Sequence, residues 1–184
     1  RSRNRSKGKS KNRKKRRRKK NYILLFVILV LIQVLVLDAI YISSMVAPLI
    51  YIAFMVLLPT DTKPMLTMFL GLLLGLTVDL LSGTPGLNTI ATLTVGYVRP
   101  NVLRLIAGED ILRERTVASV RRLGIKDFTP YALILIMGHG LLFFLFEVLT
   151  FSQLHITLFK VLCSGLVTTL LTIFISAIFT ANQK

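Results

Sequence analysis

The chain has 184 residues, of which 53% are hydrophobic, and its mean hydropathy is +0.68. A soluble domain of this size could hardly bury so much apolar surface, so the composition favours a membrane protein. The net charge is +16, but Arg1 to Lys20 hold 14 of the 24 basic residues and no acidic one. The rest of the chain carries a net charge of only +2.

Residues 1–20 contain only Arg, Lys, Ser, Gly and Asn, a composition that cannot form a core. We expect a disordered, polybasic cytoplasmic tail. One interpretation is a positive-inside signal that fixes the orientation of the chain. Another is attraction to anionic lipid head groups, worth roughly 1 kcal/mol per Lys or Arg. Nucleic acid is not expected as a partner, because the tail has no aromatic residue to stack on bases.

Apolar runs between polar breaks predict an all-α integral membrane protein with about six transmembrane helices, all in one membrane domain over residues 21–184. The predicted spans are Tyr22–Ile42, Met45–Leu58, Met65–Leu81, Leu87–Val98, Pro130–Phe151 and Leu154–Thr180. The second and fourth runs are short for a span. A four-span arrangement with re-entrant segments is therefore the alternative.

Proline and glycine set the predicted ends of these spans. Pro59 ends the second run, and Ser82–Gly86 reads as a tight turn after the third. The Arg99-Pro100 pair should end or kink the fourth helix, because proline removes a helix hydrogen bond. Thr129 is placed as an N-cap before a first-turn proline at the start of the fifth span.

The polar stretch 101–128 is the predicted main loop outside the bilayer. Four spans separate it from the tail, so the two lie on the same side, and both are rich in Arg and Lys. The opposite loops, around 43–44, 82–86 and 151–153, contain no basic residue. The positive-inside rule then places the tail, this loop and both termini in the cytoplasm.

Ionisable side chains inside spans are candidates for function, because they are costly there. Counting along the helices places Asp38, Asp79, Glu147 and Lys160 toward the outer leaflet, where Lys160 could pair with Glu147 or Asp79. One hypothesis is an outer-leaflet polar cluster that contacts a partner or a ligand. The other is interfacial snorkelling together with one structural ion pair.

Small and single polar residues have structural interpretations. Gly71, Gly75 and Asp79 recur every four residues, a strip that permits close helix packing within the chain rather than dimerisation. His139 should be hydrogen-bonded to a neighbouring helix rather than act as a proton relay. Cys163 is the single cysteine, which excludes an internal disulfide and favours a buried structural thiol.

Enzymatic signatures are missing from the sequence. There is no GxSxG, HExxH or GxxxxGK[ST] motif, and the two histidines, His139 and His155, belong to different apolar runs. We therefore expect a protein that is not an enzyme, with no catalytic, cofactor-binding or metal-binding residues.

Several short motifs share their order and spacing with one protein family. They are Pro48-Leu-Ile-Tyr-Ile, Leu58-Pro59, the stretch from Gly71 to Leu81, Gly83-Thr-Pro-Gly86-Leu-Asn-Thr-Ile-Ala91 and Tyr97-Val-Arg99-Pro100. Together they resemble the rod shape-determining protein MreD family over residues 22–180. The structural or partner-contact candidates that the resemblance implies are Pro48, Pro59, Gly71, Gly75, Asp79, Gly83, Gly86, Arg99 and Pro100. The polybasic tail departs from the family's pattern.

The resemblance implies a non-enzymatic component of the bacterial cytoplasmic (inner) membrane. Such a protein regulates cell shape by binding MreC and, with MreB, RodA and a class B penicillin-binding protein, helps to organise peptidoglycan synthesis. The family is similar in fold to the six-helix substrate-binding subunits of energy-coupling-factor transporters. The alternative function is therefore a substrate-binding membrane subunit of a vitamin-type transporter. The short outer loops favour the first function, because they leave little chain to cover a ligand.

Overall fold

The computed structural model describes residues 21–37, 46–114, 116–148 and 154–181. Asp38 and the whole polybasic tail lie outside these residues. The described part of the chain is helical and contains no strand. A first helix, Asn21–Leu37, ends in the π-helical turn η1, Gln33–Leu37. The later elements are η2 Ile50–Ile52, α2 Ala53–Val56, α3 Pro64–Ser82, α4 Leu87–Ala107, α5 Asp110–Arg113, α6 Val120–Leu123, α7 Ile125–Val148 and α8 Leu154–Ala181.

Three helices have the length and composition of a membrane span, namely α3, α7 and residues His155–Ala181 of α8. The predicted all-helical class is confirmed, and the chain is a membrane protein by this criterion. The first helix is apolar but has only 17 described residues. Helix α4 is long enough, at 21 residues, but it is less apolar than the other three.

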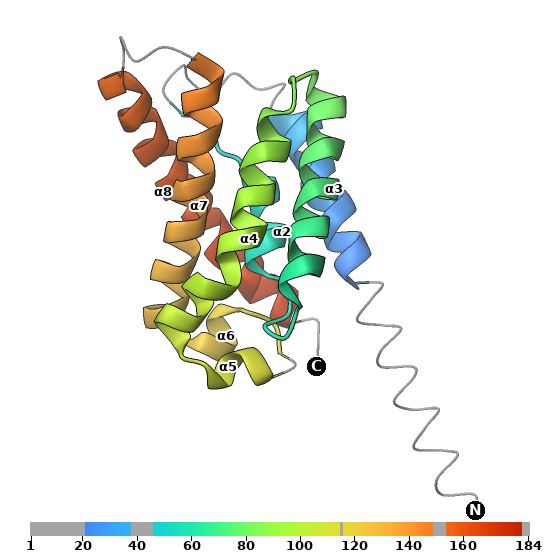
Figure 1. The fold of residues 1–184 in the computed structure, drawn as a ribbon, viewed down its shortest axis with the longest axis vertical. Helices are drawn as coiled ribbons and strands as arrows, with labels where there is room; N and C mark the ends of the chain where they lie inside the picture. The colour runs from blue at the N-terminus through green and yellow to red at the C-terminus, as the bar shows by residue number, and fades with distance from the viewer. Residues whose placement is uncertain (1–20, 38–45, 115, 149–153, 182–184) are drawn as a thin grey trace, which may run out of the picture.

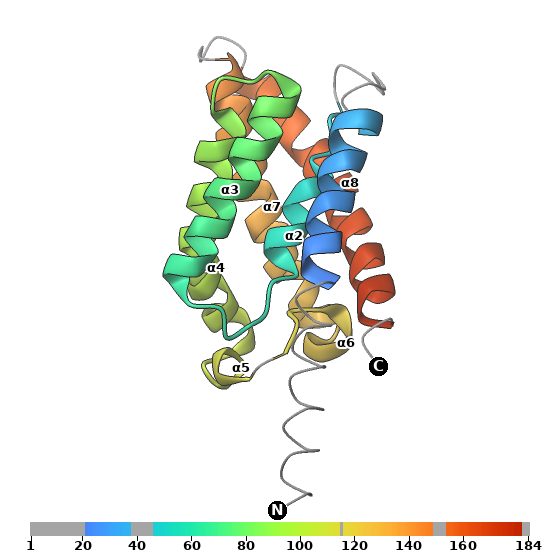
Figure 2. The ribbon, with the colours of Figure 1, turned by 90° about the vertical axis from the view of Figure 1, so that its right-hand side faces the viewer.

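The long helices surround a central segment (Figures 1 and 2). Helix α3 packs on α4, α4 on α7 and α7 on α8. The first helix closes the arrangement through an edge-to-face contact between Tyr22 and Phe179 of α8, and through η1 against α3. The short helices α5 and α6 and the C-terminal end of α8 lie at one end of the molecule. We name it the α5–α6 end. The turn between α3 and α4 lies at the opposite end, which we name the hairpin end.

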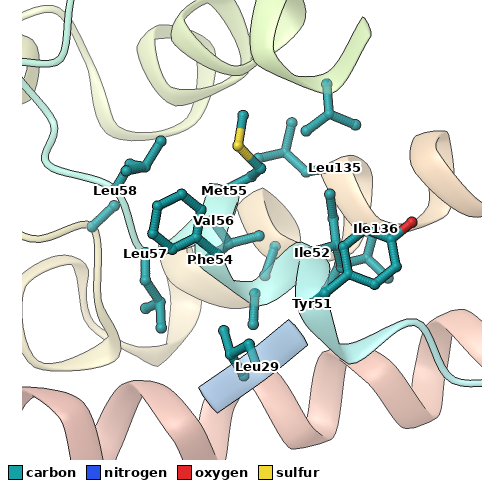
Figure 3. Packing of buried hydrophobic residues seen from close by; sticks show 14 of the residues in the cluster. Leu29, Tyr51, Ile52, Phe54, Met55, Val56, Leu57, Leu58, Leu135 and Ile136 are labelled. Carbon is teal, nitrogen blue, oxygen red and sulfur yellow. The ribbon is translucent and has the colours of Figure 1, made fainter. Parts of the chain in front are cut away.

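The segment over residues 46–59, named here the interior segment, is the most buried part of the molecule. From Tyr51 to Leu58 no residue is more than 3% exposed. Figure 3 shows its side chains packed between Leu29 of the first helix and Leu135 and Ile136 of α7. A 14-residue helix would be about 21 Å long, less than a hydrocarbon core of roughly 30 Å. The interior segment is instead extended at both ends and helical only in the middle.

Three predicted boundaries were wrong, two of them because buried side chains continue the packing. Within the predicted Met45–Leu58 run, the helical part is Ile50–Val56. Helix α4 continues through Pro100 to Ala107, since Val102 and Leu103 are buried beyond the proline. Helix α7 begins at Ile125, not at an N-cap on Thr129, and it buries Phe128 in its first turn. Much of the predicted 101–128 loop is therefore helical, whereas the predicted Met65–Leu81 and Leu154–Thr180 helices agree with α3 and α8.

The small-residue strip of α3 packs against α4 inside the chain, as its spacing favoured. A Cβ added at Gly71 would lie 2.6 Å from the carbonyl oxygen of Thr92. A Cβ added at Gly75 would lie 2.5 Å from the Thr89 Cα. On the facing helix, a Cβ at Gly96 would lie 2.9 Å from the carbonyl oxygen of Thr67. Because these neighbours are mainly backbone atoms, the two helices can approach this closely only with glycine.

Gly75→Ala is expected to destabilise the protein by about 1–3 kcal/mol, because the added methyl group forces the α3 and α4 backbones apart. Gly140→Ala is the matched control. The Cβ added at Gly140, a buried glycine of α7, would meet only Phe144 and Val161 at 3.9 Å. That variant should be unchanged or gain up to about 1 kcal/mol from helix propensity. Thermal unfolding in detergent micelles measures both variants, and equal loss in the two would contradict the packing argument.

Candidate functional site

Asp79 lies in the last turn of α3 and caps the start of α4 from the side. Its Oδ1 accepts from the Thr84 hydroxyl at 2.5 Å and from the Asn88 backbone and side-chain N–H groups at 3.1 and 2.9 Å. Its Oδ2 accepts from the backbone N–H and hydroxyl of Thr89 at 2.8 and 2.6 Å. A carboxylate at this position satisfies free N–H groups of α4 and interacts favourably with the helix dipole.

The turn that brings Asp79 to α4 depends on glycine. Gly83 and Gly86 have φ angles of +69° and +83°, which residues with a side chain rarely adopt. Gly83 ends α3, with its N–H donating to the Asp79 carbonyl, and Gly86 precedes α4. These glycines, both predicted candidates, therefore shape the hairpin end.

A hydrogen-bond chain runs from Asp79 into the centre of the molecule. Because the Asn88 Nδ2 donates to Asp79, its Oδ1 is the acceptor for the Tyr51 hydroxyl, at 2.5 Å. The Tyr51 oxygen lies 2.9 Å from Nε2 of His139, and it accepts because its only proton is directed at Asn88. His139 therefore carries a proton on Nε2. The predicted hydrogen bond of His139 is confirmed, although its partner belongs to the interior segment.

In the half of the interior segment nearer the hairpin end, main-chain N–H groups donate hydrogen bonds to side chains of α8 and of the first helix. Ala47 N–H donates to Ser164 Oγ at 2.9 Å, and Leu49 N–H donates to Thr168 Oγ1 at 3.2 Å. Ile50 N–H donates to Gln33 Oε1 at 2.8 Å. Pro48, between them, has no N–H to satisfy. Side chains of α8 and the first helix thus replace the hydrogen bonds that a regular helix would make for itself.

Arg99 of α4 bonds the other half of the interior segment. Its side chain is about 1% exposed, and Nη2 donates to the Leu58 carbonyl at 2.6 Å. Weaker contacts of 3.4 and 3.5 Å reach the Pro59 carbonyl. The Tyr131 hydroxyl of α7 donates to the Val56 carbonyl at 3.0 Å. No carboxylate among the described residues pairs with Arg99, so its charge is balanced by carbonyl dipoles.

The interior segment also joins the α5–α6 end. Thr60 N–H donates to the Thr116 carbonyl at 2.9 Å, in a short antiparallel pairing of Pro59 with Val117. Val120 N–H, at the start of α6, donates to Ser176 Oγ of α8 at 3.0 Å. Arg122 and Glu114 form an exposed ion pair. Hydrogen bonds to the main chain of the interior segment and of α6 therefore extend from the hairpin half of the molecule to the α5–α6 end.

The predicted outer-leaflet polar cluster is divided in the structure. Glu147 and Lys160 form the predicted ion pair at 3.0 Å between α7 and α8, and Lys160 lies 4.5 Å from the centre of the Phe144 ring. Asp79 is bonded to α4 instead, and its 4% exposure leaves little surface for a partner. Asp38 lies outside the described residues. Cys163 is partly exposed, not buried as predicted.

Sequence reasoning missed most of the partners of the predicted residues. Asn88, Thr89 and Tyr51 belong to the motifs that were recognised, but none was given a role. The hydroxyls of α8 had a usable signal, because Ser164, Thr168, Thr172 and Ser176 recur every four residues in an apolar helix. All four are buried. Such a stripe indicates a helix that turns its polar face inward.

The chemistry of this region is that of a structural network. Apart from Arg99 Nε, which is buried without a partner, its donors and acceptors bond to one another and to the main chain of the interior segment. Among the described residues, no group of three His, Cys, Asp or Glu side chains could hold a metal ion. No protein-family model, curated protein or solved structure matches the chain.

Asp79→Asn is expected to destabilise the protein by roughly 2 kcal/mol or more, since hydrogen bonds to a charged group contribute about 1.5–3 kcal/mol. The amide would also direct a donor at the donors of Thr89 or Asn88. Glu147→Gln is the control, because it removes a carboxylate with one partly exposed partner and should cost less than about 1 kcal/mol. Thermal unfolding in micelles gives both values. A loss at Asp79 no larger than at Glu147 would show that the cap is unimportant.

Arg99→Met is expected to lower stability by about 1.5–3 kcal/mol, because the buried Leu58 and Pro59 carbonyls lose their donors. Arg99→Lys should recover part of this loss, since an ammonium group can reach one carbonyl. The control is Arg121→Met, which removes an exposed guanidinium of α6 and should change stability by less than about 1 kcal/mol. Chemical denaturation in micelles compares the three, and an unchanged Arg99→Met would contradict the role of Arg99.

Proposed function

We propose that the chain crosses the bilayer six times, with the interior segment as the second crossing. Its extended ends let 14 residues cover a depth that a helix of that length cannot. One end of the bundle holds the start of the first helix, the basic α5–α6 region and the C-terminal end of α8 (Figure 2). Under the positive-inside rule this end faces the cytoplasm, together with both termini. Non-helical main chain is tolerated at membrane depth when protein surrounds it.

We further propose that the protein is a non-enzymatic, MreD-type component of the bacterial cell-elongation machinery in the inner membrane. The observation that carries this proposal is that the motif residues on which the MreD resemblance rests lie together in the core. Pro48 lies near the start of the interior segment and Pro59 ends it, and Arg99 bonds its carbonyls. Gly71 and Gly75 set the contact of α3 with α4, and Asp79 caps α4. The motifs differ in residue type, but the residues named here all help to hold the interior segment and the α3–α4 pair in place.

A fixed core favours a protein that binds other proteins over one that binds a small ligand. Most polar groups inside the bundle are engaged: Asp79 accepts from three residues, and Tyr51 bonds both Asn88 and His139. Among the described residues, Arg99 Nε and Thr116 Oγ1 are the buried side-chain atoms without a hydrogen-bond partner. A site for a small polar ligand needs a few polar groups that converge on the ligand. The alternative function, a transporter subunit that binds a vitamin, would require this network to open.

The test is affinity purification of the tagged full chain in mild detergent, followed by mass spectrometry of proteins and small molecules. We expect MreC and, directly or through it, RodA and a class B penicillin-binding protein. Recovery of an ATPase module with a bound metabolite would instead support the transporter. A Glu147→Gln, Lys160→Gln double variant keeps the net charge and removes the outer ion pair. It should retain the same partners if that pair is structural, and lose them if the pair contacts a partner.

A further inference from the structure

The outward face of α4 differs in composition from those of its neighbours. Every exposed residue between 23 and 36 of the first helix, 65 and 81 of α3, and 156 and 178 of α8 is hydrophobic. Lipid tails suit such faces. On α4 the exposed residues are Ile90, Thr94, Tyr97, Val98, Asn101, Arg104 and Leu105. Thr94 and Tyr97 therefore point outward from the middle of α4, whereas the first helix, α3 and α8 expose only hydrophobic residues over the ranges given.

Five of these residues, Ile90, Thr94, Tyr97, Asn101 and Arg104, form a stripe with spacings of four and three residues, named here the α4 stripe. This spacing is the one by which two helices pack along a common seam. The Thr94 hydroxyl donates to the Ile90 carbonyl at 2.9 Å. Tyr97 and Asn101 have no hydrogen-bond partner among the described residues. Asn101 lies about 9 Å from the end of α4, and Tyr97 lies about 15 Å from it, by the rise of a helix.

Contact with lipid tails is unfavourable for the polar side chains of this stripe. A side-chain amide or hydroxyl without a partner is costly in an apolar medium. In membranes, such side chains commonly form hydrogen bonds between helices. On α7, which packs on α4, Gly138 is exposed and a Cβ added there would have open space around it. A second helix can therefore approach α7 closely at this glycine.

We propose that the α4 stripe is the contact between two copies of this chain, related by a two-fold axis along the membrane normal. Two copies in the same orientation place each residue opposite its own counterpart, at the same depth. The Asn101 amide has both donors and an acceptor, and so does the Tyr97 hydroxyl. Each can therefore bond its counterpart in the second copy.

In this dimer, the charges at the end of the α4 stripe are complementary between the two copies. Arg104 lies 3.7 Å from Glu109 in one copy, and both side chains are more than half exposed. Two copies bring two arginines and two glutamates together, so each guanidinium can pair with either carboxylate. Like charges are then not opposed across the contact. This proposal rests on the membrane placement of the chain and not on its role in cell elongation.

The test uses disulfide crosslinking of the full chain in isolated native membranes. In a Cys163→Ser background, Thr94→Cys or Asn101→Cys is oxidised with copper phenanthroline and analysed by non-reducing electrophoresis. Leu170→Cys, on the exposed apolar face of α8, is the control. We expect at least about five-fold more covalent dimer at Thr94 and Asn101 than at Leu170, because a disulfide needs Cα atoms within about 7 Å. Equal or weaker crosslinking at the stripe would overturn the proposal.

A second measurement does not depend on cysteine chemistry. Asn101→Leu, in detergent, should weaken dimerisation about ten-fold by mass photometry, which corresponds to one interhelical hydrogen bond. A photoreactive residue in place of Tyr97 should crosslink to a second copy. Capture of a different membrane protein at Tyr97, with no covalent dimer, would overturn the proposal. Such a result would leave the proposed cell-elongation function unaffected, since only the purification experiment tests it.

Discussion

The main chain of the interior segment imposes the constraint on which the rest of the structure depends. Its residues are buried from Tyr51 to Leu58, and much of its backbone is not helical. Buried main-chain N–H and C=O groups without partners are costly. Since the segment cannot satisfy them alone, the surrounding helices must. Gln33, Ser164 and Thr168 accept from its N–H groups, and Tyr131 and Arg99 donate to its carbonyls.

This requirement explains why α8 carries its polar residues on the inside. Ser164 and Thr168 bond the interior segment, and Ser176 bonds the start of α6. The exposed side chains of the same helix are apolar. The requirement also explains the prolines. Pro48 and Pro59 lie where the segment is extended, and each removes one N–H that would otherwise need a partner.

Local patterns predicted what depends on local interactions. The apolar runs predicted α3 and α8 within one or two residues. The depth of charged residues along the spans left Glu147 and Asp79 as alternative partners of Lys160, and the structure pairs it with Glu147. The missed features depend on residues distant in the sequence. Nothing local indicates that Tyr51 bonds His139, or that α4 continues through Pro100 because Val102 and Leu103 are buried. A proline rule fails where tertiary packing outweighs it.

Helix α4 shows how a helix of limited hydrophobicity can be part of this bundle. It is long enough to span but contains Arg99, which is buried, and Arg104. Its closest neighbour is α3, whose glycines admit α4 at backbone contact and whose Asp79 caps its first turn. These contacts require only the two helices and the turn between them. The hairpin can therefore form as a unit. In the proposed six-span arrangement it would enter the bilayer together, with the apolar outward face of α3 compensating for the polar residues of α4. The interior segment then supplies the carbonyls that Arg99 needs. The same hydrogen bonds stabilise the buried charge of Arg99 and satisfy the carbonyls at the end of the segment.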